Sequence, residues 1–247
     1  MAVFLGLFLL LLVLLFAVIT WQVVAGGPLT GVDERLSQAL VHPDRFSSGL
    51  SDLGNVEVAL PVLLLVAGYV AWRGRAAGTD LWWLRPAVAA ALMALVPAIV
   101  VPLKEWTARP GTPVVPPGTG YYPSGHTATA AIAYGSATLL LLPWLRTPAA
   151  RRVLAGGCAV LVLGVSYGLV RRGWHWPLDV VASWCLSTVL LTTLFLVPRA
   201  VLGRSTRRSF SGTPGSRSGP GSPATPSDPA GRAGSRESPT NRSPSSS

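Results

Sequence analysis

Six apolar stretches, each long enough to cross the hydrocarbon core of a bilayer as a helix, dominate the sequence. A membrane-spanning helix needs about 20 predominantly apolar residues. The stretches cover residues 3–24, 56–72, 86–103, 127–145, 153–170 and 178–197. Half of the 247 residues are hydrophobic and only 12% are charged, which excludes an ordinary soluble domain. The sequence therefore predicts an all-α fold, a bundle of six transmembrane helices, in a multi-pass membrane protein.

Two interpretations of the first stretch stay open. It lacks a basic leader, and its apolar run is long for a signal peptide, which favours a retained span. Cleavage near Ala25 is the alternative, and it would leave the remaining topology unchanged.

Arginine residues in the loops predict the orientation of the helices, because cytoplasmic loops carry an excess of Lys and Arg. Ten arginines lie between the second and third apolar stretches, between the fourth and fifth stretches, and after the sixth stretch: Arg73, Arg75, Arg85, Arg146, Arg151, Arg152, Arg199, Arg204, Arg207 and Arg208. This predicts a cell-membrane protein with both termini in the cytoplasm and the third-to-fourth and fifth-to-sixth loops outside. The asymmetry is large only if Lys104, Arg109, Arg171 and Arg172, in those opposite loops, have a functional role.

The end of the chain has a different composition. Residues 203–247 are mostly Ser, Gly, Pro and Arg, with almost no large apolar side chain, so they cannot bury enough surface to offset the entropy of ordering. The sequence predicts a transmembrane domain over residues 1–202 and a disordered, basic cytoplasmic tail over residues 203–247. Much of the net charge of +10 lies in this tail. That charge favours binding to anionic lipid headgroups over nucleic acid, for which no motif is present.

Two loops place a histidine beside the start of a predicted span. In "YYPSGHTATA" a Pro-Ser-Gly turn delivers His126 to the first turn of a helix. In "RRGWHWPLDVVAS" His175 precedes Asp179 by four residues, and Pro177 suits the first position of a helix, so the carboxylate and the imidazole can meet. An ionisable group at a span end is costly without a function. Structural capping is the alternative interpretation of the His175 and Asp179 spacing.

Cations accompany the two histidines on the same predicted face of the membrane. They are Lys104, the only lysine, with Arg109, Arg171 and Arg172. The predicted helix starts at Ser124 and Pro177 would add free backbone amides that attract an anion. Together these groups predict a phosphate ligand. Anchoring of the cations at the membrane interface is the alternative. The two cysteines, Cys158 and Cys185, fall inside spans and suit packing better than a disulfide or a metal site.

The order Lys…Arg-Pro, Pro-Ser-Gly-His and His-x3-Asp, over residues 30–198, resembles the type 2 phosphatidic acid phosphatase superfamily of membrane lipid phosphatases. The resemblance implies that His175 is a nucleophile that forms a phosphohistidine and that Asp179 orients it. It implies that His126 protonates the leaving oxygen and then activates water. It also implies a reaction without metal or cofactor. The phosphoryl oxygens would be held by Lys104, Arg109, Ser124, Gly125, Arg171 and Arg172.

The match is imperfect at the arginines. The family pattern Lys-x6-Arg-Pro would place arginine at Gly111, but Arg109 comes two residues early. The pattern Ser-Arg-x5-His-x3-Asp asks for Ser and Arg at Gly168 and Leu169, and Arg171 and Arg172 come later instead. Long guanidinium side chains can still reach the same oxygens.

The resemblance implies an integral membrane phosphatase acting on a lipid phosphate or polyprenyl diphosphate at the outer leaflet, with phosphatidate, phosphatidylglycerophosphate and undecaprenyl diphosphate as substrate types. A catalytically weak or inactive lipid-phosphate-binding protein is the alternative that the shifted arginines favour. A vanadium-dependent haloperoxidase is a remote third, because its soluble architecture conflicts with six spans. The oligomeric state is left open by the sequence.

One further segment lies in the first outer loop. Residues 30–40 begin with a capping-box-like "TGVD" and space Val32, Leu36 and Leu40 on one helical face. This predicts an interfacial helix that roofs the site, with an ordinary loop as the alternative. His42, just after it, is assigned to a loop without a function.

Overall fold

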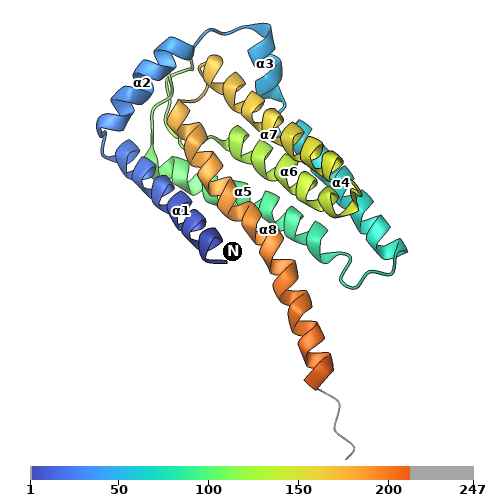
Figure 1. Ribbon diagram of the computed structural model, residues 1–247. Coiled ribbons are helices and arrows are strands. Elements are labelled where there is room, and N and C mark those ends of the chain that lie inside the picture. Colours follow the sequence, from blue (N-terminus) through green and yellow to red (C-terminus); the bar gives the residue numbers. More distant parts are fainter. Residues whose placement is uncertain (1, 212–247) are drawn as a thin grey trace, which may run out of the picture.

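The computed structural model describes residues 2–211, whose regular structure is helical. In chain order the helices are α1 (Ala2–Val24), α2 (Pro28–Leu40), α3 (Arg45–Asp52), α4 (Val56–Ala76), α5 (Leu84–Thr107), α6 (Gly125–Leu141), the short η1 (Leu142–Trp144), α7 (Pro148–Arg171) and α8 (Pro177–Ser211), as Figure 1 shows. Within residues 2–211 the only β-type pairing is an isolated bridge between Pro110 and Thr119. The prediction of an all-α fold is confirmed for this part of the chain.

Five helices are long and apolar enough to cross a membrane. They are α1, α4, α5, α6 together with η1, and α7. In α8 the apolar part found among the described residues, Pro177–Thr192, is shorter than these five. Five of the six predicted spans are therefore confirmed as helices of membrane-spanning length, and the sixth stays a prediction.

Helix α8 continues past the predicted boundary between the transmembrane domain and the tail. It ends at Ser211, so residues 203–211 are helical although their composition predicted disorder. Extending an existing helix costs far less than nucleating one, so a helix anchored in the bundle can propagate into polar sequence. The rest of the predicted tail, residues 212–247, lies outside the described residues.

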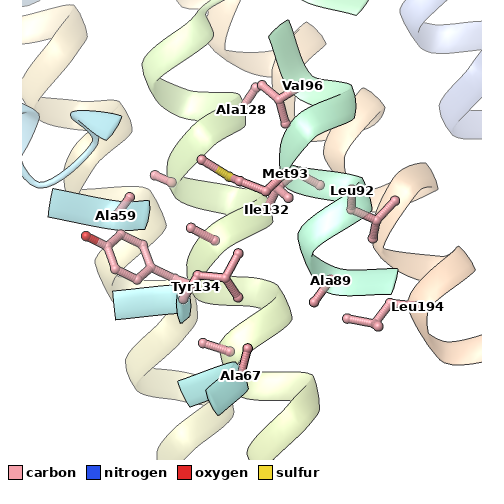
Figure 2. Close-up of a cluster of buried hydrophobic side chains, with 14 of the residues drawn as sticks. Ala59, Ala67, Ala89, Leu92, Met93, Val96, Ala128, Ile132, Tyr134 and Leu194 are labelled. Carbon is pink, nitrogen blue, oxygen red and sulfur yellow. The ribbon is translucent and has the colours of Figure 1, made fainter. Parts of the chain in front are cut away.

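Helix α6 lies at the centre of the bundle and contacts α4, α5, α7 and α8 (Figure 1). Its buried side chains include many small ones: Ala128, Ala130, Ala131, Ala133, Ser136 and Ala137. Small residues let helix backbones approach closely, which favours association of helices in a membrane. Figure 2 shows Ala128 and Ile132 of α6 beside Val96 and Met93 of α5 in the main buried cluster. This packing fixes the start of α6 relative to its neighbours.

Helix α2 covers one end of the bundle, together with α3 (Figure 1). At this end α5 and α7 finish and α6 and α8 begin. The polar residues Asp33 and Ser37 of α2 are buried, whereas its apolar ones are exposed: Leu29, Val32, Leu36 and Leu40. The predicted helix over residues 30–40 is confirmed, but it begins at Pro28, because proline is accommodated at the first helical position.

Helix α3 was not predicted from the sequence. It begins with a capping box, in which Asp44 accepts from the Ser47 amide at 2.6 Å and Ser47 accepts from the Asp44 amide at 3.1 Å. The helix packs against α7. Helices α2 and α3 thus lie over the loops that lead to His126 and His175, the two histidines predicted to be catalytic.

Candidate active site

His126 and His175 converge at the end of the bundle covered by α2 and α3. Ser124 caps α6 by accepting from the Thr127 amide at 3.3 Å, and His126 follows in the first turn. His175 lies two residues before α8 begins at Pro177. The two imidazole centroids are 6.3 Å apart in an edge-on arrangement. His126 is half-buried and His175 is 4% exposed, so one phosphoryl group can contact both rings.

Asp179 holds the ring of His175. Its Oδ2 lies 3.2 Å from Nδ1 of His175 and accepts from the Trp176 amide at 3.1 Å. An ionised carboxylate can only accept, so Nδ1 of the imidazole carries a hydrogen, and in the neutral ring the lone pair lies on Nε2. The predicted contact of His175 with Asp179 is therefore formed.

Arg109 lies between two buried carboxylates. Its Nη1 donates to Asp179 Oδ1 at 2.5 Å, and its Nη2 donates to Asp33 Oδ2 at 2.6 Å. Its guanidinium carbon lies 5.3 Å from the centroid of the Trp176 ring. The sequence predicted Arg109 as a phosphate ligand, whereas here both terminal nitrogens donate to carboxylates.

Asp33 is the member of this cluster that sequence analysis missed. Its side chain is fully buried, and its Oδ1 accepts from the Leu178 amide at 2.9 Å. Burial raises the pKa of Asp33 above its usual range, and the hydrogen bonds from Arg109 and Leu178 oppose that shift. The "TGVD" pattern had pointed to a local cap, not to a long-range ion pair.

Lys104 lies at the end of α5 and is half-buried. Among residues 2–211, no carboxylate lies within 4.0 Å of its ammonium group. The amides of Gly125 and His126, at the start of α6, have no backbone acceptor in that part of the chain. A lysine and two free amides at a helix start form an arrangement suited to an anion.

Ser124 joins the starts of α6 and α8. Its amide donates to the Asp179 carbonyl at 3.2 Å, and its carbonyl accepts from Ser183 Oγ at 2.9 Å. The Ser124 side chain is completely buried, with its oxygen used as the α6 cap. The residue therefore fixes the two histidine-bearing segments against each other.

Residues 84–201 match the model of the PAP2 superfamily. Over this segment, which includes His126, His175 and Asp179, the chain is similar to the PAP2 superfamily. A similar solved structure is a transmembrane PAP2-type phosphatidylglycerolphosphate phosphatase from Bacillus subtilis, with 20% sequence identity and a TM-score of 0.67. The match covers 78% of this chain and 96% of that one, and at this identity it shows a shared fold. No curated protein sequence matches the chain. The five apolar helices of membrane-spanning length, together with the fold shared with a transmembrane protein, indicate a multi-pass membrane protein.

The two remaining cations of the PAP2 resemblance are held by α3. Arg171 donates from Nε to Asp44 at 2.8 Å in an exposed pair. Arg172 donates from Nη1 to Ser51 at 2.7 Å and to Asp52 at 3.0 Å. The guanidinium of Arg172 also lies 3.8 Å from the centroid of the Trp174 ring, which is 5.8 Å from the ring of His126. Arg172 thus lies in the wall around His126, whereas Arg171 is fixed at the surface.

Proposed function

We propose that this protein is an integral membrane phosphatase that removes the terminal phosphate from a lipid phosphate or polyprenyl diphosphate. The observation that carries the proposal is the convergence of His126 with the His175–Asp179 pair at 6.3 Å between ring centroids. Phosphoryl transfer to an imidazole requires one neutral and one protonated ring close together, because one attacks while the other donates a proton.

The reaction proceeds in two balanced steps. Nε2 of His175 attacks phosphorus and forms a P–N bond, while the P–O bond to the lipid breaks and His126 protonates the departing oxygen. His126, now neutral, then takes a proton from water. The resulting hydroxide attacks phosphorus, the P–N bond breaks, and phosphate leaves with His175 restored. Asp179 stabilises the positive charge on His175 in both steps.

Lys104 and the amides of Gly125 and His126 are the groups that would hold the phosphoryl oxygens. Ser124 was predicted as a fourth, but its side chain is completely buried and caps α6. Lys104 has no carboxylate partner within residues 2–211, and the two amides have no backbone acceptor there. Charge that develops on the oxygens in the transition state would therefore meet donors already in place. Arg109 donates to carboxylates through both terminal nitrogens. Arg171 does so through Nε and Arg172 through Nη1, so the predicted phosphate contacts of these two would use their other N–H groups.

An apolar groove supports a lipid as the substrate. It has a volume of about 590 Å³ and is lined by α4, α5 and the start of α6, including Lys104 and Gly125. Its other lining residues are apolar apart from Thr129: Val56, Leu60, Leu63, Leu64, Ala90, Met93, Ala94, Val96, Pro97, Val100 and Val101. A hydrocarbon chain in this groove would bring its phosphate to the end that carries Lys104.

The proposal includes six spans, with the active site on the extracytoplasmic side and both termini in the cytoplasm. The connections α4–α5 and α6–α7, which are flanked by arginines in the adjoining helix ends, lie at the end opposite to the start of α8 (Figure 1). The positive-inside rule supports a cytoplasmic position for that end. Binding of the tail to anionic headgroups belongs to the same proposal.

Phosphate release by the purified protein tests this function. In detergent with EDTA, we expect release from at least one of phosphatidate, phosphatidylglycerophosphate and undecaprenyl diphosphate. His175→Ala should abolish turnover, and His126→Ala should lower kcat by about 10²–10⁴-fold, the usual contribution of a general acid. His42→Ala is the matched control, because His42 is exposed in a loop and should retain wild-type activity.

A lipid-phosphate-binding protein without turnover is the second candidate. The observation that favours it is that Arg109 and Arg171 already donate to carboxylates. Wild-type protein that binds these lipids and releases no phosphate would support this candidate and overturn the phosphatase.

A further inference from the structure

A continuous buried chain of charged groups leads from α2 to the proposed nucleophile. Asp33 accepts from Arg109 at 2.6 Å, Arg109 donates to Asp179 at 2.5 Å, and Asp179 lies 3.2 Å from Nδ1 of His175. The side chains of both carboxylates are 0% exposed and that of Arg109 is 6% exposed. Interactions between charges at such positions are weakly screened by solvent.

Asp33 also contacts the backbone of the element that carries Asp179. Its second oxygen accepts from the Leu178 amide at 2.9 Å, in the first turn of α8. That amide has no partner inside its own helix, because it belongs to the first turn. Asp33 therefore joins α2 to the start of α8 at the residue next to Asp179.

The formal charges of the cluster give Asp33 an electrostatic role. Arg109 and Asp179 alone would form a neutral pair, and the guanidinium would weaken the attraction of Asp179 for a positive imidazole. With Asp33 included, two carboxylates and one guanidinium leave a net charge of −1 beside His175. A phosphoryl group bound to imidazole nitrogen makes the ring positive, so this charge favours the transition state.

We propose that Asp33 is a positioning residue for the phosphoryl transfer, which acts through Arg109 to hold Asp179 against His175 and to keep a net negative charge on this buried cluster. The inference rests on the proposed function, and it assigns α2 a part in the chemistry.

Other titratable groups around the cluster come from several elements. Lys104 approaches from α5 and His126 from α6. Tyr121 and Tyr122 approach from the loop before α6, with the Tyr121 ring centroid 6.3 Å from that of His175. All of them remain unchanged in the variants below, and the phosphate of the substrate titrates equally with each variant. Differences between pH profiles therefore report the charge of the Asp33–Arg109–Asp179 cluster.

The test is the pH profile of kcat/KM, whose acid limb reports protonation of the nucleophile. Asp33→Asn makes the cluster neutral, so protonated His175 is less favoured and the acid limb should move to lower pH by about 1 unit. Arg109→Gln leaves a net charge of −2 and should move the limb to higher pH. The double variant restores a net charge of −1, now carried by Asp179 alone, so its limb should coincide with that of the wild type.

The expected loss of kcat for Asp33→Asn is about 10–100-fold, by analogy with residues that orient metal-binding histidines. Ser37→Ala is the matched control, since Ser37 lies one turn later on the buried face of α2, and it should retain the wild-type rate and profile. Asp33→Glu keeps the charge and should keep the position of the limb even where kcat falls.

Three results would overturn the inference. An Asp33→Asn variant that folds, judged by its unfolding midpoint in micelles, and keeps the wild-type limb would leave Asp33 a purely structural residue. A double variant whose acid limb is displaced from that of the wild type would lead to the same conclusion. Because the double variant removes Asp33 and Arg109 together, it provides the test where a single variant fails to fold. Wild-type protein without phosphate release would overturn the proposed function and this inference together, whereas the first two results overturn the inference alone.

Discussion

Gly168 lies on α7 at a point where a Cβ atom has no room. A Cβ built there would be 2.7 Å from the Ser47 carbonyl oxygen and 2.8 Å from the Ser51 amide nitrogen, both in the backbone of α3. The next residue, Leu169, is fully buried in the apolar core. These are the two positions at which the PAP2 pattern has Ser and Arg. The presence of Gly168 in place of Ser is therefore explained by the close packing of α3 on α7, and that of Leu169 in place of Arg by its burial in the apolar core.

Substitution of this glycine should destabilise the protein. Gly168→Ser forces the α3 backbone away from α7, and we expect a loss of about 1–3 kcal/mol, as for other overpacked sites. Gly156→Ser in the same helix is the control, because no atom lies within 4 Å of a Cβ there. Thermal unfolding in micelles measures both. Equal midpoints for the two variants would contradict the prediction.

The spacing in the sequence predicted His126, His175 and Asp179 because each is tied to a local pattern, a turn before a helix or a four-residue separation. Asp33 has no such signal, since its partner Arg109 is 76 positions away and the ion pair forms only when α2 folds over the bundle. The same reasoning explains why the role of Arg109 was not predicted correctly from the sequence motif, which assigned this residue to phosphate binding. Long-range pairing of this kind cannot be inferred from one sequence.

Helix α3 depends on Asp44 at two points. The carboxylate caps the helix through the Ser47 amide and accepts from Arg171. These two hydrogen bonds, the Ser47 amide first, lower the pKa of Asp44 from 3.8 to about 2. The ionised carboxylate therefore stabilises the folded state above pH 3.8, and that contribution is lost as the pH falls from there through about 2.

We expect Asp44→Ala to lower the unfolding midpoint at pH 6 and to have a much smaller effect near pH 2, where the wild-type carboxylate becomes protonated. Asp80→Ala, at an exposed loop position without a hydrogen bond in the part of the chain that the structure describes, should leave the midpoint unchanged at both pH values. Midpoints measured in micelles at the two pH values decide the matter. A difference between wild type and Asp44→Ala that is equal at pH 6 and pH 2 would refute the prediction.

The hydropathy of the sequence predicted the positions of the long helices well, but it predicted the residues at which they end less well. The third predicted span stopped at residue 103, where the apolar run ends, but α5 continues through Lys104 to Thr107. Residues of α3 lack an apolar run, and its eight residues are defined by the cap and by contact with α7. A helix that is stabilised by capping and packing has a weaker hydropathy pattern in the sequence than a helix that must be apolar to cross a bilayer.

The apolar groove lined by α4, α5 and the start of α6 extends to Lys104. Ala94→Trp would fill part of this groove. We expect kcat/KM for a long-chain lipid phosphate to fall by about 10-fold or more, since hydrocarbon contacts of a few methylenes are lost. Turnover of a small water-soluble phosphate monoester, which has no chain to accommodate, should stay unchanged.

Ala98→Trp is the matched control, because Ala98 is an exposed alanine of the same helix that does not line the groove. Its kinetics should equal those of the wild type with both substrates. Equal losses for the lipid and for the small phosphate in Ala94→Trp would show a general defect and would refute a role for the groove.

Helix α2 presents apolar residues outward, while its buried Asp33 carboxylate contacts Arg109. We expect its outer face to lie in the interface of the bilayer, so that lipid helps to hold the helix that carries Asp33. Under the proposed function, the surrounding amphiphile thereby supports the geometry around His175. A detergent that covers α2 poorly should therefore disturb the environment of His175 even while the bundle stays folded.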